Sequence, residues 1–220
     1  MRARGKYLVI LAGLFAVVMV MTTAPVGRDR EPIYNGHSLS EWLHAARPGY
    51  INPPAPPAEA TAAVRHIGTN ALPALLKWAS YDPTRLQSKL RPIMSGSDHP
   101  VDAEDGFRIL GPVAGPAIPG LTRLAIKSSS DERVMRCARC LAYIGPEAVP
   151  ALADIVSNYR GKARYYPIAI LASFGTNAQP AAPVLVRCLS DPDAHVRAAA
   201  TNALSKLSPK ILANTNAPEH

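Results

Sequence analysis

Apolar and polar residues along the chain form short amphipathic segments, and a recurring pattern separates them. From residue 58 onward apolar positions recur every three or four residues, the period of a helix with one buried face. The period breaks at "IGTNALPAL", "VAGPAIPGL" and "IGPEAVPAL", which start at Ile67, Val113 and Ile144. Each break places a small residue, an alanine and a proline between two apolar runs. The pattern predicts pairs of short helices joined by tight corners.

We expect each corner to contain a small residue that ends one helix and a proline that begins the next. Glycine adopts the left-handed conformation that closes a helix, and proline is tolerated in a first turn because its missing N–H would have no partner there. The predicted corners are Gly68 with Pro73, Ala114 with Pro119, Gly145 with Pro150, and Gly175 with Pro183. An incomplete fifth unit has its corner at Ser208. Successive corners lie about 30 to 46 residues apart, a length typical of stacked supersecondary repeats.

Two of these units resemble HEAT-type repeats, in the short form found in phycobilisome-lyase-like HEAT proteins. The residues concerned are "RCLAYIGPEAVPAL" from Arg139 and "DPDAHVRAAATNALSKLSP" from Asp191, where Val196 and Arg197 follow Asp191 as in the family pattern. The resemblance covers residues 58–212. It implies an all-α fold, a short α-solenoid of stacked helical hairpins, and it suggests binding rather than a particular activity.

The chain divides into four predicted regions. Residues 1–27 form a signal peptide or membrane anchor, and residues 28–57 a capped helix followed by a proline-rich linker. Residues 58–212 form the repeat domain, and residues 213–220 a disordered tail. Ser38 and Glu41 have the spacing of a capping box at the start of the first helix. We expect an exposed loop at residues 95–105, between the first two repeats.

The N-terminal region carries an addressing signal. Arg2, Arg4 and Lys6 precede the uncharged stretch Tyr7–Ala24. As a hydrophobic helix this stretch would be about 27 Å long, close to the ~30 Å of membrane hydrocarbon. It fits either an uncleaved anchor or a signal peptide. In both cases the basic flank stays in the cytoplasm and the body is exported. The protein would then be a bacterial protein anchored in the cytoplasmic membrane, or a secreted or periplasmic one if the segment is cleaved.

The composition favours helices and does not single out nucleic acid as a partner. Aromatic residues make up 6% of the chain, whereas sheets are rich in aromatic and β-branched residues. The formal net charge is +8, and half of it lies in residues 1–30. The remaining body is only mildly basic, which is ordinary for a soluble domain.

Few residues have the spacing of a reactive site. Cys137 and Cys140 are three residues apart inside a predicted helix, where packing is the preferred interpretation and a redox, disulfide or metal role is the alternative. His37, Glu41 and His44 could share a helix face as metal ligands, but His37 precedes the cap, so an exposed capping segment is preferred. The sequence contains no nucleophile elbow or phosphate-binding loop. We therefore expect no catalytic residue, metal or cofactor.

One surface segment stands out as a candidate partner-binding site. The stretch "NYRGKARYYP" combines aromatic and basic residues that together could hold an anionic or sugar-like group by stacking and charge. Its candidate residues are Tyr159, Arg160, Lys162, Arg164, Tyr165 and Tyr166. The alternative is a solvated loop with some tyrosines packed inward. We expect Arg133, Arg136 and Arg139 to form a charged helix face beside it.

The sequence thus predicts a non-enzymatic scaffold for protein–protein interaction, presented outside the cytoplasmic membrane. Its partner would be a protein or peptide, with the membrane contacted through the N-terminal segment. One alternative is a HEAT-like lyase or chaperone for chromophore attachment, which the repeat subtype implies. The other is nucleic-acid binding, as in HEAT-like DNA glycosylases, which the export signal opposes.

Overall fold

The computed structural model describes residues 31–49, 55–82 and 99–207. Contacts divide the chain into two compact units, Met1–Glu31 and Pro32–His220. The predicted anchor, the tail at 213–220 and the corner at Ser208 lie outside the described residues. The proline-rich linker lies partly outside them, at residues 50–54.

The second unit begins with a β-hairpin, which the all-α prediction lacked. Strand β1 (Ile33–Tyr34) pairs antiparallel with β2 (His37–Ser38). Between them Asn35 and Gly36 both have positive φ, 47° and 80°, as a two-residue hairpin turn requires. Asn-Gly is the strongest sequence signal for such a turn.

Helix α2 (Leu39–Ala45) follows directly and has the predicted capping box. The hydroxyl oxygen of Ser38 accepts a hydrogen bond from the Glu41 N–H at 3.4 Å, and the Ser38 N–H donates to the Glu41 carboxylate at 2.7 Å. Trp42 Nε1 donates to the carbonyl of Tyr34 at 3.0 Å and so ties the helix to the hairpin. Helix α2 packs on α3 and α6, within the same compact unit as the repeats.

The rest of the described chain is a series of helical hairpins. In each hairpin a first helix is joined to a second helix through a short 3-10 segment. The hairpins are α3 (Pro57–Ile67), η1 (Gly68–Ala71) and α4 (Leu72–Ser80); α6 (His99–Leu110), η2 (Gly111–Ala117) and α7 (Ile118–Ile126); α8 (Asp131–Ile144), η3 (Pro146–Ala148) and α9 (Val149–Asn158); and α10 (Tyr165–Ser173), η5 (Gly175–Ala181) and α11 (Ala182–Cys188). Segment η4 (Lys162–Arg164) precedes α10, and α12 (Ala194–Leu207) begins the last unit.

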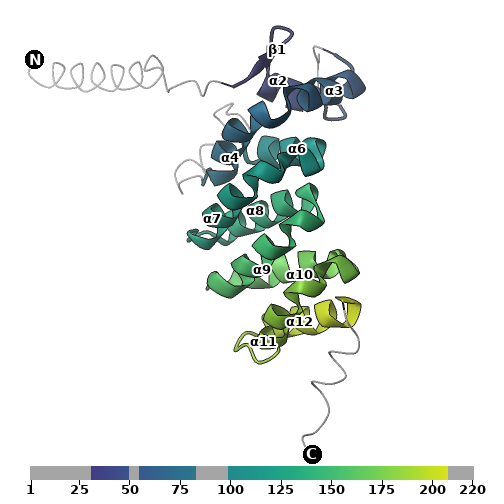
Figure 1. Cartoon of the computed structure of the whole chain (residues 1–220). Helices are drawn as coiled ribbons and strands as arrows, with labels where there is room; N and C mark the ends of the chain where they lie inside the picture. Colours follow the sequence, from purple (N-terminus) through teal and green to yellow (C-terminus); the bar gives the residue numbers. More distant parts are fainter. Residues whose placement is uncertain (1–30, 50–54, 83–98, 208–220) are drawn as a thin grey trace, which may run out of the picture. The chain divides into compact units, whose positions relative to one another are not determined.

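The hairpins stack in two layers, as the solenoid prediction requires (Figure 1). The first helices α3, α6, α8, α10 and α12 contact one another in that order, and so do the second helices α4, α7, α9 and α11. Each second helix also contacts the first helix of the next hairpin. The buried leucines and alanines therefore form a core that runs along the stack between the layers, instead of one shared centre.

The corners use glycine and proline as predicted, with one correction. Gly68, Gly145 and Gly175 end their first helices with φ of 58°, 117° and 54°. In the second hairpin this residue is Gly111, with φ of 54°, and the predicted Ala114 is buried in the middle of η2. The sequence pattern did not predict Gly111 because the corners differ in length. Segments η2 and η5 have seven residues, whereas η1 has four and η3 has three.

Proline occupies the first turn of every second helix, as expected. Pro73, Pro119, Pro150 and Pro183 are each the second residue of their helix. The alanine before each second helix is buried, so the two helices of a hairpin meet closely. These alanines are Ala71, Ala117, Ala148 and Ala181.

The expected loop at residues 95–105 is helical from His99 onward, where its polar residues find partners on α2 and directly after it. Asp102 is 0% exposed and accepts from Arg47 Nη2 at 2.8 Å, and His44 Nε2 lies 3.0 Å away. Arg47 Nε also donates to Asp105 at 2.6 Å. A polar stretch that looked solvated in sequence therefore fastens α2 to α6.

By length and composition alone, the stretch His99–Ile126 is long and apolar enough to cross a membrane. In the structure it comprises α6, η2 and α7, and Gly111 separates the two helices. Its buried apolar residues, such as Phe107 and Leu121, belong to the core between the layers.

The predicted charged face of α8 is wrong for its central residue. Arg136 is 2% exposed and donates to the carbonyls of Ala79 at 3.1 Å and Tyr81 at 2.7 Å, at the end of α4. Its neighbours on α8 pair with carboxylates of earlier hairpins, Arg133 with Asp82 and Arg139 with Glu104. These arginines join one repeat to another.

Candidate functional site

The second helices expose a regular row of side chains, which we call the second-helix face. It is formed by the outward residues of α4, α7, α9 and α11, which pack side by side. The corner proline of each helix and the residue four positions after it are both exposed, because that spacing returns to the same side of a helix. The residues in this second position are Lys77, Arg123, Asp154 and Arg187.

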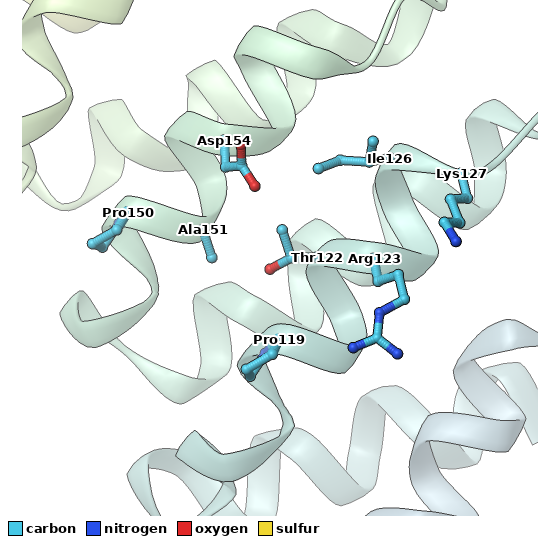
Figure 2. A pocket seen from close by; sticks show the side chains of 8 residues that line it. All are labelled: Pro119, Thr122, Arg123, Ile126, Lys127, Pro150, Ala151 and Asp154. Atoms are coloured by element: carbon cyan, nitrogen blue, oxygen red, sulfur yellow. The ribbon is translucent and has the colours of Figure 1, made fainter.

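A groove of about 600 Å³ lies on this face between α7 and α9. We call it the α7–α9 groove. Its lining residues are Pro119, Thr122, Arg123, Ile126, Lys127, Pro150, Ala151 and Asp154. Figure 2 shows Thr122 and Ile126 turned toward the α9 side of the groove, where Ala151 and Asp154 lie. The groove thus has an apolar floor and charged side chains at its edges.

A second hollow of about 340 Å³ lies on the other side of α9, next to α11. We call it the α9–α11 hollow. Val184 and Pro192 provide apolar surface, while Arg160 and Arg187 bring positive charge. Arg164 also lines it and pairs with the buried Asp191.

Most of the cations of the second-helix face have no carboxylate partner. Within residues 31–49, 55–82 and 99–207, neither Arg123 nor Lys127 makes an ion pair, and the same holds for Arg160 and Arg187. Asp154 accepts a hydrogen bond from Asn158 Nδ2 at 2.6 Å on its own helix. The face is therefore positive and able to receive an anionic group.

The predicted segment at residues 158–167 does not form one patch. Tyr159 is only 5% exposed, and its hydroxyl donates to Asp131 Oδ1 at 2.6 Å. Burial and this hydrogen bond raise the pKa of Tyr159 to about 12. Asp131 also accepts from the Ala163 N–H at 3.2 Å, so Tyr159 holds the loop against α8.

The other candidate residues separate onto two sides. Arg160 and Arg164 line the α9–α11 hollow, and Lys162 is exposed at the start of η4. Tyr166 is partly buried, with the Arg139 guanidinium 5.9 Å from its ring centre. Tyr165 is exposed and lies edge-on to Tyr166 at 6.3 Å. The aromatic residues on α10 therefore belong to the first-helix layer, and only the arginines reach the second-helix face.

The cysteines pack in the core. Cys137 and Cys140 are buried on α8 as free thiols. Burial raises the pKa of Cys137 to about 12 and that of Cys140 well above its ordinary value. Equivalent positions on α12, two repeats later, are the buried alanines Ala200 and Ala203. These positions take small side chains, which agrees with the packing interpretation.

The histidines considered as metal ligands point to different partners. His37 Nδ1 lies 3.7 Å from Glu41, whereas His44 faces Asp102 on α6. In the part of the chain that the structure describes, no group of three or more His, Cys, Asp or Glu side chains is arranged to hold a metal ion.

The stacked hairpins define an α-helical repeat protein, and a comparison with protein families specifies the repeat. Residues 182–211 match the HEAT repeat family model. The chain therefore contains a HEAT repeat at these residues, which supports the resemblance, while the phycobilisome-lyase-like subtype stays a prediction. No curated protein and no solved structure matches the chain.

The structure explains the residues that carry this match. Asp191 Oδ1 accepts from the Asp193 N–H at 2.9 Å, just before α12. Arg197 Nη1 donates to the carbonyls of Asp191 and Pro192 at 2.7 and 2.9 Å, and Val196 is buried. The family signature therefore builds the turn between α11 and α12.

Sequence reasoning missed Arg123, Lys127 and Arg187 as candidate site residues. A signal was present, because Arg123 and Arg187 stand four residues after a corner proline. The sequence contains many exposed cations, and only the side-by-side packing of α7, α9 and α11 shows that these occupy one surface.

Proposed function

We propose that this protein is a non-enzymatic scaffold that binds another protein on its second-helix face, outside the cytoplasmic membrane. HEAT repeats generally mediate protein–protein interaction. The observation that carries the proposal is the continuous row of second helices with a groove and a hollow between successive members. A solenoid with such a surface binds extended partners without needing a closed active site.

The non-enzymatic part of the proposal is supported by the state of the nucleophile candidates. Cys137 and Cys140 are buried, and their raised pKa keeps them protonated at neutral pH. Thiolate chemistry requires the opposite, a lowered pKa and access to substrate.

Presentation outside the membrane is supported by the sequence alone. The basic residues Arg2, Arg4 and Lys6 before the uncharged stretch Tyr7–Ala24 follow the rule that positive flanks stay in the cytoplasm. We propose either a retained anchor or a cleaved signal, with the repeats exported in both cases.

Two measurements test the proposal. N-terminal sequencing of the membrane and soluble fractions, with protease added to spheroplasts whose outer envelope has been removed, shows whether the segment is retained and on which side of the cytoplasmic membrane the repeats lie. Photo-cross-linking from position 151 in the α7–α9 groove, compared with position 198 on the exposed side of α12, identifies a bound protein. Repeats protected from external protease, or a cross-link pattern that is the same at both positions, would contradict the proposal.

A second candidate function is nucleic-acid binding, which the exposed cations Arg123, Lys127 and Arg187 on the second-helix face favour. Phosphate contacts by lysine and arginine give affinity that falls steeply with salt. A cytoplasmic location of the repeats, together with salt-dependent binding of an oligonucleotide, would support this function over the scaffold.

A further inference from the structure

The groove and the hollow on either side of α9 repeat the same combination of surfaces. In the α7–α9 groove Ile126 and Ala151 supply apolar surface beside Arg123. In the α9–α11 hollow Val184 and Pro192 do so beside Arg187. One ligand that crosses α9 could therefore place an apolar side chain on each side and meet a cation at both.

The net charge of this surface determines which charge a ligand must carry to bind it. Asp191 is neutralised by Arg164, whereas Asp154 keeps its charge, because its partner Asn158 is neutral. Asp154 offsets part of the charge of Arg123 and Lys127, and the surface stays positive because the cations of the groove and the hollow outnumber the carboxylates. A ligand with carboxylates would offset this positive potential, whereas a basic ligand would be repelled.

The spacing of the two sites fits an extended chain. Packed helices lie about 8 to 10 Å apart, so the grooves on the two sides of α9 are separated by about one helix width. In the extended polyproline II conformation a chain advances about 3.1 Å per residue with three residues per turn, so side chains three positions apart point to the same side at a separation of about 9 Å. Side chains i and i+3 of an extended segment therefore reach the groove and the hollow together.

We propose that the second-helix face from α7 to α11 binds an acidic, extended segment of a partner protein. Two apolar side chains three residues apart enter the α7–α9 groove and the α9–α11 hollow. The carboxylates that flank them meet the cations Arg123, Lys127, Arg160 and Arg187. This inference rests on the proposed scaffold function and specifies the chemistry of its partner.

The test uses the full chain and a fluorescein-labelled synthetic peptide of glutamates and aspartates with two leucines three residues apart. Binding is followed by fluorescence anisotropy at low and physiological salt. We expect saturable binding that weakens as salt screens the charges. Arg123→Glu and Arg187→Glu are each expected to weaken binding by about tenfold.

Matched controls separate this surface from general charge effects. Arg65 is an exposed arginine of α3, in the first-helix layer, and Arg65→Glu makes the same charge change away from the site. We expect its affinity to stay within about twofold of the unchanged protein, since the site lies on the other layer. A peptide with lysine in place of every acidic residue should not bind, and one with both leucines replaced by serine should bind more weakly.

Several results would overturn the inference. One is equal loss of affinity in Arg65→Glu and Arg187→Glu, and another is equal binding of the lysine peptide. Tighter binding of a single-stranded oligonucleotide or of phosphatidylglycerol vesicles than of the acidic peptide, lost in Arg187→Glu, would assign the surface to nucleic acid or to a membrane instead.

The cross-linking experiment and the Arg187→Glu variant together distinguish a failure of this inference from a failure of the scaffold function. A protein partner that cross-links at position 151 but is insensitive to Arg187→Glu would leave the scaffold standing and reject the acidic segment. The absence of a position-specific cross-link would reject the scaffold itself.

Discussion

Single polar residues hold the hairpins together at the points where loops meet helices. Tyr159 is the clearest case, because its hydroxyl bonds Asp131 from a site that is almost closed to solvent. Replacing it with phenylalanine removes the hydrogen bond but keeps the ring. We expect Tyr159→Phe to lower the free energy of unfolding at pH 7 by about 1 kcal/mol.

The same residue predicts a pH dependence. The folded state raises the pKa of Tyr159 from its ordinary value of 10.0 to about 12, so the folded state retains a proton that the unfolded chain releases. Its contribution to stability is complete below pH 10 and is lost as the pH rises from 10 toward 12. We expect the urea midpoint to fall less steeply in this window for Tyr159→Phe than for the unchanged protein. Tyr143→Phe, at an exposed position of α8, is the control; parallel curves for all three proteins would contradict the prediction.

Replacing Arg136 is expected to lower the free energy of unfolding more than Tyr159→Phe does, because the guanidinium of Arg136 is buried. Its guanidinium donates to two backbone carbonyls at the end of α4, and removal would leave those carbonyls without these donors. We expect Arg136→Ala to cost about 3 to 5 kcal/mol in urea unfolding.

Arg133→Ala on the same helix serves as the comparison. Arg133 pairs with the more exposed Asp82, and such pairs are worth about 1 kcal/mol or less. Equal losses in the two variants would mean that Arg136 does not connect the repeats as described.

At the scale of the element, the conformation of one glycine sets the end of each first helix. In the second hairpin that glycine is Gly111, while Gly115 lies in the same 3-10 segment without a positive φ. A side chain at a left-handed residue costs about 1 to 2 kcal/mol. We therefore expect Gly111→Ala to lower the melting temperature, measured by circular dichroism.

The control for that variant is Gly115→Ala in the same segment. A Cβ at Gly115 would meet no heavy atom within 4 Å, so we expect a melting temperature close to that of the unchanged protein. The opposite ranking would place the corner near Ala114, where the sequence pattern predicted it.

At the scale of the whole molecule, each repeat is stabilised by its contacts with neighbouring repeats. Each hairpin contacts mainly the adjacent hairpins, although α8 also reaches back to α4, so a repeat at the end of the stack has fewer partners than one in the middle. Leu204 on α12 and Leu141 on α8 are both fully buried leucines and make a matched pair.

We expect the two leucines to respond differently to truncation. Leu204→Ala should raise hydrogen exchange mainly in α10, α11 and α12, whereas Leu141→Ala should raise it in α8 and on both sides of it, in α6, α7, α9 and α10, and cost about 2 to 5 kcal/mol. A uniform rise in exchange in both variants would indicate a single cooperative core instead of a row of repeats.

The sequence by itself determined the architecture, because corners are local. The glycines at 68, 145 and 175 and the prolines after them act within a few residues, and the apolar period needs no knowledge of the partner helix. Gly111 and the seven-residue η2 were missed because two corner lengths occur in one chain. The Asn35-Gly36 turn was also readable in sequence but was overlooked.

Only the tertiary structure decided which polar residues are internal and which form a surface. Tyr159, Arg136 and Asp102 are polar in sequence, yet each is buried against a residue distant along the chain. Arg123 and Arg187 look like ordinary solvated cations until the packing of α7, α9 and α11 brings them to one face. Burial and charge neutralisation depend on long-range contacts, and a one-dimensional pattern does not contain them.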